Sequence, residues 1–437
     1  MLTSLWRHPS FPRLWAAETI SQTGSQVTLL ALPLAAAKTL DASPFEMGML
    51  AAAGSMPSLL IGLIAGAWVD RLPRRPILIA TDLGRAALVL LVPAAWVVDL
   101  LHLWLLYAVA FLSGTLTVFS VAAFGAILPS LVARARLVEA NGKVQAGVSG
   151  AEIAGPGVAG VLVGWLAAPL ALVLDTVSFL ASALLVGRIP AFESAAKPGG
   201  LDRSRSSLRS EVAEGVRVVI HHPVLRVLIG CPAGWLFSWN LIMAVFVLFA
   251  TRGLGLGAGQ LGLVVAAGGA GALAGALLVG RITAGLGLGR TLVALPLVAA
   301  SGTIAFPLAN GSPLAAGSLL AAGMFLFSFG QMNFGVNAST LRQTLVPDRM
   351  VGRVLGTYQF LSWGMRPVGA LAGGAIAQAL GLRVALAVGV GGLFVVVAVL
   401  ARSPLRSLRA HPMAGQDAMA NADAPASGAE LVGTRPG

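Results

Sequence analysis

The first apolar stretch of the chain carries a stripe of polar side chains that could bind a ligand or exchange protons. Glu18, Gln22, Ser25 and Gln26 are spaced one to four residues apart, so a helix would place them on one face. An ionised carboxylate is expensive to bury in apolar surroundings. We therefore predict that Glu18 is protonated reversibly. The neutral residues of the stripe are candidates for contact with a ligand if this helix lines a cavity. The alternative is that Glu18 lies close enough to the surface to stay hydrated.

Two more charges, of opposite sign, lie in the middle of apolar stretches: Glu152 and Arg366. If folding brings them together, burial and mutual attraction act in opposite directions on the carboxylate, so its protonation would depend on their separation. This pattern makes both residues, with Glu18, candidates for proton coupling. Two other interpretations stay open: a static ion pair that fixes packing, and an arginine that binds an anionic group of a ligand.

Composition places these charges in a membrane protein. Of the 437 residues, 57% are apolar and 11% are charged, whereas soluble domains carry roughly a quarter charged residues. A bilayer core needs about 20 apolar residues per helix, and long runs without alternation favour helices over a barrel. The sequence predicts an all-α protein with twelve transmembrane helices, at 13–37, 46–69, 74–98, 101–130, 141–167, 169–188, 223–250, 258–284, 289–309, 312–345, 350–380 and 382–402.

Lys and Arg are distributed unequally between the loops on the two sides of these helices. One side collects nearly all of them, and the other receives only Lys38, Arg252 and Arg383. Because basic loops face the cytoplasm, we predict cytoplasmic termini and a place in the inner (plasma) membrane of a bacterium. The net charge of +12 then reflects topology and contact with anionic lipids, and no nucleic-acid partner is expected.

One long loop divides the chain into two halves. We expect residues 1–189 and 223–403 to form lobes of six helices each, joined by a cytoplasmic linker at 190–222 in which 208–219 could form a surface helix. Residues 404–437 are rich in Ala, Gly, Asp and Pro, which predicts a disordered cytoplasmic tail. Interruptions of the apolar stretches recur at an offset of roughly 210 residues. For example, Pro156 in the first half corresponds to Pro367 in the second. Parallel repeats of this kind are typical of two-lobed transporters that handle substrate between the lobes.

The loop after the second predicted helix carries a motif. It reads Gly66-Ala67-Trp68-Val69-Asp70-Arg71-Leu72-Pro73-Arg74-Arg75, which resembles the major facilitator superfamily signature of Gly, an Asp-Arg pair and a basic cluster, with Pro73 where Gly is frequent. A plain basic loop would explain the arginines but not Asp70. We expect a cytoplasmic charge network that closes an inner gate, formed by Gly66, Asp70, Arg71, Arg74, Arg75, Asp82 and Arg85.

Small residues follow one side of the fifth predicted helix: Gly147, Ala151, Gly155, Pro156 and Gly160. The pattern resembles the Gly-Pro-rich signature of antiporter branches of the superfamily, although two alanines replace expected glycines. Small residues four apart form a groove for a neighbouring helix, and proline bends the helix. Ordinary close packing is therefore the alternative interpretation.

Further matches extend the resemblance from about residue 11 to 409. They are 11–15, 82–85, 128–132 and 139–141 in the first half, and 222–223, 341–343, 347–349 and 352–354 in the second. Over this length the chain resembles the major facilitator subgroup that includes the enterobactin exporter and macrolide efflux proteins. The resemblance implies transport but names no substrate, because proteins with this fold handle different molecules.

The remaining candidate cavity residues lie in the seventh and tenth predicted helices: Trp239, Asn240, Gln331, Asn333 and Asn337. No phosphate-binding Gly-Lys motif is present, and the five histidines and single cysteine have no metal-ligand spacing. We predict no enzyme activity, no cofactor and no metal site, so transport would draw on an ion gradient or the membrane potential.

Few polar groups are available to fix a hydrophilic ligand. We therefore expect a monomeric, proton-coupled exporter of amphipathic small molecules, either drugs or siderophore-like compounds, that works by alternating access. An importer or uniporter of a small metabolite is the alternative, followed by a non-transporting receptor. A channel would need a continuous polar ring, and the polar residues here are scattered.

Overall fold

The computed structural model describes residues 5–8, 10–69, 72–133, 136–190, 223–345 and 351–407, and within these residues the chain is helical with no strand. The expected surface helix at 208–219, almost all of the linker and residues 408–437 of the tail lie outside them. The helices are α1 (Phe11–Lys38), α2 (Pro44–Val69), α3 (Arg74–Val97), α4 (Leu103–Leu131), α5 (Leu137–Leu166), α6 (Ala168–Gly187), α8 (Pro223–Leu248), α9 (Ala258–Leu286), α10 (Leu288–Thr303), α11 (Ala305–Leu308), α12 (Pro313–Leu345), α13 (Val351–Leu380) and α14 (Leu382–Arg402).

Ten of the helical segments in the described residues are long and apolar enough to span a membrane, counting α10 and α11 as one. The other two long helices, α1 and α13, carry more polar residues and are not among the ten. Two short 3₁₀-helices, Leu5–Arg7 and Pro404–Ser407, flank the bundle, and a π-helical turn, Phe249–Gly253, extends α8. Each apolar stretch of the sequence coincides with helix in the structure.

The segment predicted as one helix at 289–309 is interrupted at Ile304, between α10 and α11. Pro307 explains the break. It has no N–H to donate to the carbonyl of Thr303, and its ring crowds that carbonyl. Other prolines, such as Pro156 in α5 and Pro367 in α13, stay inside continuous helices.

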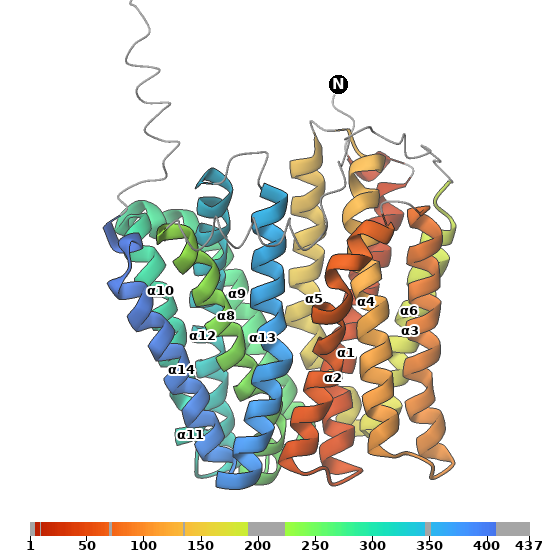
Figure 1. Ribbon diagram of the computed structural model, residues 1–437. Helices are drawn as coiled ribbons and strands as arrows, with labels where there is room; N and C mark the ends of the chain where they lie inside the picture. Colours follow the sequence, from red (N-terminus) through yellow and green to blue (C-terminus); the bar gives the residue numbers. More distant parts are fainter. Residues whose placement is uncertain are drawn as a thin grey trace, which may run out of the picture.

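The helices pack in two groups that follow the sequence (Figure 1). In the first, α1 packs on α5 and α6, α2 on α4, and α3 on α4 and α6; in the second, α8 packs on α13 and α14, α9 on α12, and α10 on α12 and α14. The pairs α2–α13 and α5–α9 are the most extensive contacts between the groups. We call residues 10–190 the N-terminal half and 223–407 the C-terminal half.

Glycines let the helices of the two halves approach closely. A Cβ on Gly374 of α13 would lie 2.9 Å from Gly48 Cα and 2.9 Å from the Pro44 carbonyl of α2. A Cβ on Gly262 of α9 would lie 2.5 Å from the Pro156 carbonyl and 2.9 Å from Gly160 Cα of α5. Side chains larger than hydrogen would therefore hold the two halves apart at these points.

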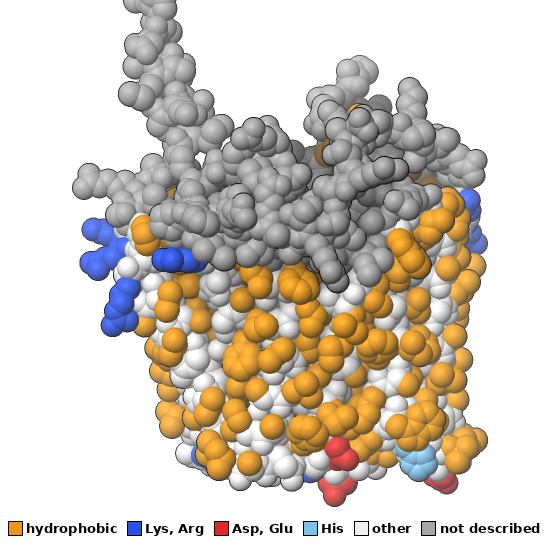
Figure 2. Space-filling model, in the orientation of Figure 1, with side chains coloured by type: hydrophobic (Ala, Val, Ile, Leu, Met, Phe, Trp, Pro, Cys, Tyr) orange, Lys and Arg blue, Asp and Glu red, His pale blue; other side chains and the backbone are white. Residues whose placement is uncertain are grey.

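An ion pair joins the halves at the end of the bundle where α1 finishes and α2 begins, which we call the Asp41 end. The Arg252 guanidinium lies 2.5 Å from the Asp41 carboxylate and also donates to the Ala37 carbonyl at 2.8 Å. The glycine contacts lie near the same end, since α2 starts and α5 and α13 finish there. On the visible face, Lys and Arg gather mostly toward the opposite end (Figure 2).

The glycine contacts predict that a larger side chain at Gly374 weakens the joint between the halves. Gly374→Val should destabilise the protein by about 1–3 kcal/mol, the usual result of overpacking. The matched control is Gly391→Val in the neighbouring α14, where an added Cβ meets no atom within 4 Å. Thermal unfolding of the purified proteins checks this, and equal melting temperatures for both variants would contradict the packing described above.

Candidate functional site

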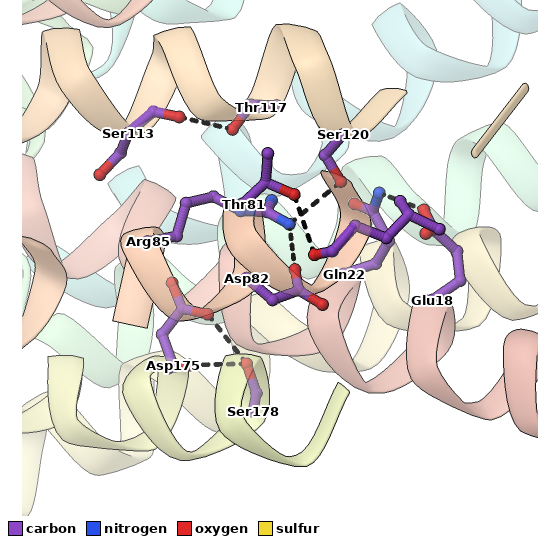
Figure 3. Close-up of polar contacts among 11 residues, drawn as sticks. Glu18, Gln22, Thr81, Asp82, Arg85, Ser113, Thr117, Ser120, Asp175 and Ser178 are labelled. Atoms are coloured by element: carbon purple, nitrogen blue, oxygen red, sulfur yellow. Dashed lines mark hydrogen bonds and ion pairs between the residues drawn. The ribbon is translucent and has the colours of Figure 1, made fainter. Parts of the chain in front are cut away.

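Charged residues meet inside the N-terminal half. Asp82 and Arg85 of α3 are buried, with 3% and 7% of their surface exposed, and form an ion pair at 2.5 Å. The Arg85 guanidinium also donates to the Ser120 hydroxyl of α4 at 3.2 Å (Figure 3). It lies 4.3 Å from the Phe179 ring centroid of α6. The ion pair therefore ties α3 to α4 and α6.

Glu18 of α1 lies at the edge of this ion pair. Its carboxylate accepts a hydrogen bond from the Gln22 side-chain amide at 2.7 Å, and it lies within electrostatic range of Asp82 and Arg85. A small pocket lies here between α1, α3, α4 and α6, and it is lined by Leu14, Ala17, Glu18, Ser21, Leu78, Asp82, Arg85, Ser120, Phe124, Ser182 and Val186. Glu18 thus bonds a neutral partner and faces a pocket that already holds an ion pair.

Asp175 of α6 extends the same cluster. It is buried, accepts hydrogen bonds from Thr28 of α1 and, at 3.0 Å, from Ser178, and lies within electrostatic range of Arg85. Gly24 makes room for this contact, because a Cβ there would lie 2.4 Å from the Asp175 carboxylate. We call Glu18, Asp82, Arg85 and Asp175 the N-half charge cluster.

Glu152 and Arg366 occupy matching places in the two halves, each halfway along a helix of 30 residues. Glu152 is exposed and Arg366 is half-buried. No ion pair joins them among the described residues. Their side chains are accessible although both lie midway along their helices.

The other predicted residues of α1 and the C-terminal half have varied surroundings. Gln22, Ser25 and Gln26 are half-buried on α1. Asn333 and Asn337 are 0% and 4% exposed, and the Asn337 amide donates to the Thr283 hydroxyl of α9 at 3.1 Å. Both asparagines therefore lie in the α9–α12 contact rather than on a cavity wall.

The cavity candidates Trp239 and Asn240 of α8 and Gln331 of α12 are half-buried. Trp239 stacks on Phe327 with ring centroids 3.7 Å apart, in an aromatic group that includes Phe306. The Asn240 amide donates to the Leu236 carbonyl of its own helix at 2.8 Å. Trp239 is thus engaged in packing inside the C-terminal half in this conformation. Gln331 has no hydrogen-bond partner among the described residues.

The gate residues expected from the loop motif are only partly described. Asp70 and Arg71 lie outside the described residues, and Gly66 lies in α2. Arg74 is half-buried at the start of α3, and Arg75 donates from Nε to the Val186 carbonyl at 3.3 Å and from Nη2 to the Gly187 carbonyl. The Asp82–Arg85 pair lies two turns deeper along α3, so the described contacts place it in the N-half charge cluster.

The small residues of α5 face two neighbours. A Cβ on Gly147 would meet Thr19 of α1 at 2.4 Å, and one on Gly155 would meet Gln26 of α1 at 2.5 Å. Pro156 and Gly160 contact α9 as described, and Ala151 is buried. The stripe therefore packs α5 on α1 within its own half and on α9 across the halves.

Sequence reasoning missed the partners of the charges more than the charges themselves. Ser120, Thr28 and Ser178 complete the N-half charge cluster, and buried Arg342 stacks on Tyr358 at 4.1 Å. Small hydroxyl residues are too common in membrane helices to stand out by spacing. Among the described residues, no group of three or more His, Cys, Asp or Glu side chains could hold a metal ion.

Comparison with known proteins identifies the family. A family model described as "Transmembrane secretion effector" matches residues 3–430. The chain belongs to the transmembrane secretion effector family. As a member, it is a membrane transporter of the major facilitator type and a multi-pass protein of the bacterial inner membrane.

Individual relatives of this transmembrane secretion effector are distant. It is 25% identical over 382 residues to the uncharacterized MFS-type transporter YfiS of Bacillus subtilis, covering 86% of the chain and 88% of the relative. It is 28% identical over 391 residues to the multidrug efflux pump Tap of Mycolicibacterium fortuitum, covering 87% and 92%.

Solved structures resemble this family member in fold alone. The nucleoside transporter NupG matches with a TM-score of 0.73 at 12% identity, over 89% of the chain and 98% of that protein. A bacterial homologue of the iron transporter ferroportin in its inward-facing state matches with a TM-score of 0.70 at 18% identity, over 92% and 99%. Since these proteins carry unlike cargoes, the fold leaves the substrate open.

The buried pair predicts strong coupling between Asp82 and Arg85. Asp82→Asn leaves the Arg85 charge unpaired, and Arg85→Gln does the same to Asp82, so each should cost about 3–5 kcal/mol of stability. The double variant Asp82→Asn/Arg85→Gln should cost clearly less than the sum. Thermal unfolding of the four proteins measures the coupling, and additive losses would mean that the pair does not form.

Proposed function

We propose that the protein is a proton-coupled exporter of amphipathic small molecules that works by alternating access between two six-helix lobes. Residues 1–189 and 223–403 would form the lobes, with 190–222 as the cytoplasmic linker and 404–437 as a cytoplasmic tail. The protein would act as a monomer. The observation that carries this proposal is the position of Glu18, a membrane-depth carboxylate beside the Asp82–Arg85 pair. Among the described residues, its one hydrogen-bond partner is the neutral Gln22 side chain.

The proposed topology has twelve transmembrane helices and both termini in the cytoplasm. It takes α1 and α13 as spans beside the ten apolar ones. The start of α1 and the end of α14 lie at one end of the bundle (Figure 1). Because basic residues favour the cytoplasmic side, the Asp41 end would face outward. The glycine contacts and the Arg252–Asp41 pair would then close the outer side.

Proton coupling is proposed for Glu18 and Glu152. Both are carboxylates at membrane depth without a hydrogen-bonded basic partner among the described residues, and such groups commonly form proton relays in transporters. Glu18 lies within the field of Asp82 and Arg85, so a change in that pair during lobe movement would alter the ease of its protonation. Glu152 would respond instead to what enters the space between the lobes.

Export is favoured over import by the scarcity of polar groups that could fix a hydrophilic substrate. The match to Tap, named a multidrug efflux pump, supports the same direction. A uniporter or importer of a small metabolite is the alternative, and the fold neighbours include transporters of nucleosides and metals. Direct measurement of proton movement separates these possibilities.

Everted membrane vesicles that contain the protein should lose a preformed pH gradient when a transported compound is added. The panel is macrolides, lipophilic cations and amphipathic aromatic anions, and a pH-sensitive dye follows the gradient. We expect at least one compound to collapse it, and Glu18→Gln to reduce that response to the level of vesicles without the protein. Glu152→Gln should weaken the response to the same compound.

The matched control is Glu139→Gln, because Glu139 is an exposed carboxylate paired with Arg136 and Lys143 near the start of α5. It should keep the full response. If the parent protein never responds although the purified protein binds a panel compound, proton antiport is wrong and a uniporter, importer or receptor takes its place.

A further inference from the structure

Arg366 and Arg85 both lie near the middle of a long helix, but they differ in their polar partners. Arg85 pairs with Asp82 and Ser120, whereas Arg366 has no hydrogen bond or ion pair within the described residues, and its one recorded contact is the Trp363 ring at 6.0 Å. The Arg85 Nε is buried without a partner, but no atom of Arg366 is. The Arg366 guanidinium is therefore unpaired and still accessible.

The packing of α13 shows which way Arg366 faces. Gly369 lies against the Phe237 carbonyl of α8, and a Cβ on Gly48 of α2 would lie 2.7 Å from the Ala370 carbonyl. Arg366 precedes both by about one turn and lies between these two faces. Leu361 and Val368, on the opposite side of α13, are exposed apolar residues of the kind that face lipid. Arg366 thus faces the interior between the halves.

Two further residues share this face of α13. Gln359 and Trp363 precede Arg366 by seven and three residues, so all three form one stripe along the helix. Gln359 is exposed, and Trp363 is 39% exposed although the stripe is turned away from lipid. The stripe offers an amide, a large aromatic ring and a cation to whatever enters the space between the halves.

Glu152 faces the same interior from the other half. It lies on α5 between the α1-facing side at Gly155 and the α9-facing side at Pro156, opposite the exposed Val158 and Val161. Its carboxylate does not pair with Arg366 among the described residues. The described residues of the opposite half therefore supply no anion that balances Arg366 in this conformation.

The geometry points to a binding subsite for an amphipathic organic anion at Arg366 and Trp363, with the ligand's carboxylate, sulfonate or phosphate on the guanidinium and its apolar body on the indole. This subsite rests on the proposed transport function and gives it a substrate class. A guanidinium binds such oxyanions through two parallel hydrogen bonds. An indole contributes broad apolar contact without a fixed hydrogen-bond pattern.

A matched pair of probes tests the subsite. Naphthaleneacetate and naphthaleneacetamide have nearly the same shape and differ by one negative charge. Isothermal titration of each into the full-length protein in phosphatidylcholine nanodiscs, with empty nanodiscs as blank, should show at least about tenfold tighter binding of the acetate, as expected for a charged hydrogen bond. Arg366→Gln should bring the two dissociation constants together without weakening the amide.

The control is Arg290→Gln, since Arg290 is an exposed arginine at the start of α10, and it should keep the wild-type preference. Arg366→Lys should keep part of it, and Trp363→Ala should weaken both probes by a similar factor. If Arg366→Gln does not fold, Arg366→Lys and Trp363→Ala test the subsite in its place. The subsite is refuted if wild-type protein does not prefer the acetate, or if Arg366→Gln retains the preference.

Two further comparisons test where the anion comes from and whether the subsite can be judged independently of proton-coupled transport. Adding phosphatidylglycerol to the nanodiscs should leave acetate binding unchanged if the natural ligand is a soluble anion, and should weaken it in an Arg366-dependent way if the ligand is an anionic lipid. Both results support the subsite. The titration needs no pH gradient, so an Arg366-dependent preference for the acetate would stand even if the vesicle experiment excludes proton antiport. In the same way, loss of that preference would leave a positive vesicle result intact.

Discussion

The organisation of this transporter follows from the cost of a charge in the bilayer. Each ionisable group at membrane depth must be paired, hydrated or neutralised, and the protein uses these options in different places. Asp82 and Arg85 neutralise each other inside one half, with Ser120 taking a remaining donor. Glu152 and Arg366 have no such partner among the described residues and face the space between the halves. The Asp82–Arg85 pair inside one half is thus separate from Glu152 and Arg366, which remain available to a ligand or a proton.

Close approach of the halves depends on residues without side chains. At Gly48 and Gly374, and at Gly160 and Gly262, backbone meets backbone, so dispersion contacts and weak C–H···O contacts replace side-chain interdigitation. These smooth surfaces can separate without disentangling side chains. The Arg252–Asp41 pair adds a contact that water can replace, because Asp41 is largely exposed. A joint built in this way suits two halves that must part during a transport cycle.

Much of the fold could be predicted from the sequence because lipid leaves few choices. Apolar runs of spanning length must be helical, and the described helices coincide with the predicted stretches, apart from the break at Ile304 that Pro307 explains. The site was harder to predict. Charge inside apolar stretches singled out Glu18 and Arg366 as candidates. The sequence did not indicate that Asn333 and Asn337 would pack against α9 or that Trp239 would stack on Phe327. The helical period of 3.6 residues predicts which residues share a face of one helix. It does not predict which neighbouring helix that face contacts.

The two halves are repeats of each other, so the unpaired charges Glu152 and Arg366 can be compared at corresponding positions. Pro156 and Pro367 follow Glu152 and Arg366 at offsets of four and one, in helices that correspond in the repeat. The two helices nevertheless use their prolines and glycines for different contacts, α5 with α1 and α9, and α13 with α2 and α8. Repetition alone would therefore not place opposite charges at matching depth. A static ion pair would satisfy both charges, yet it is absent between them in the described residues, whereas an ion pair does join the halves at the Asp41 end. The halves therefore contact each other at the Asp41 end, whereas Glu152 and Arg366 stay unpaired among the described residues, midway along α5 and α13.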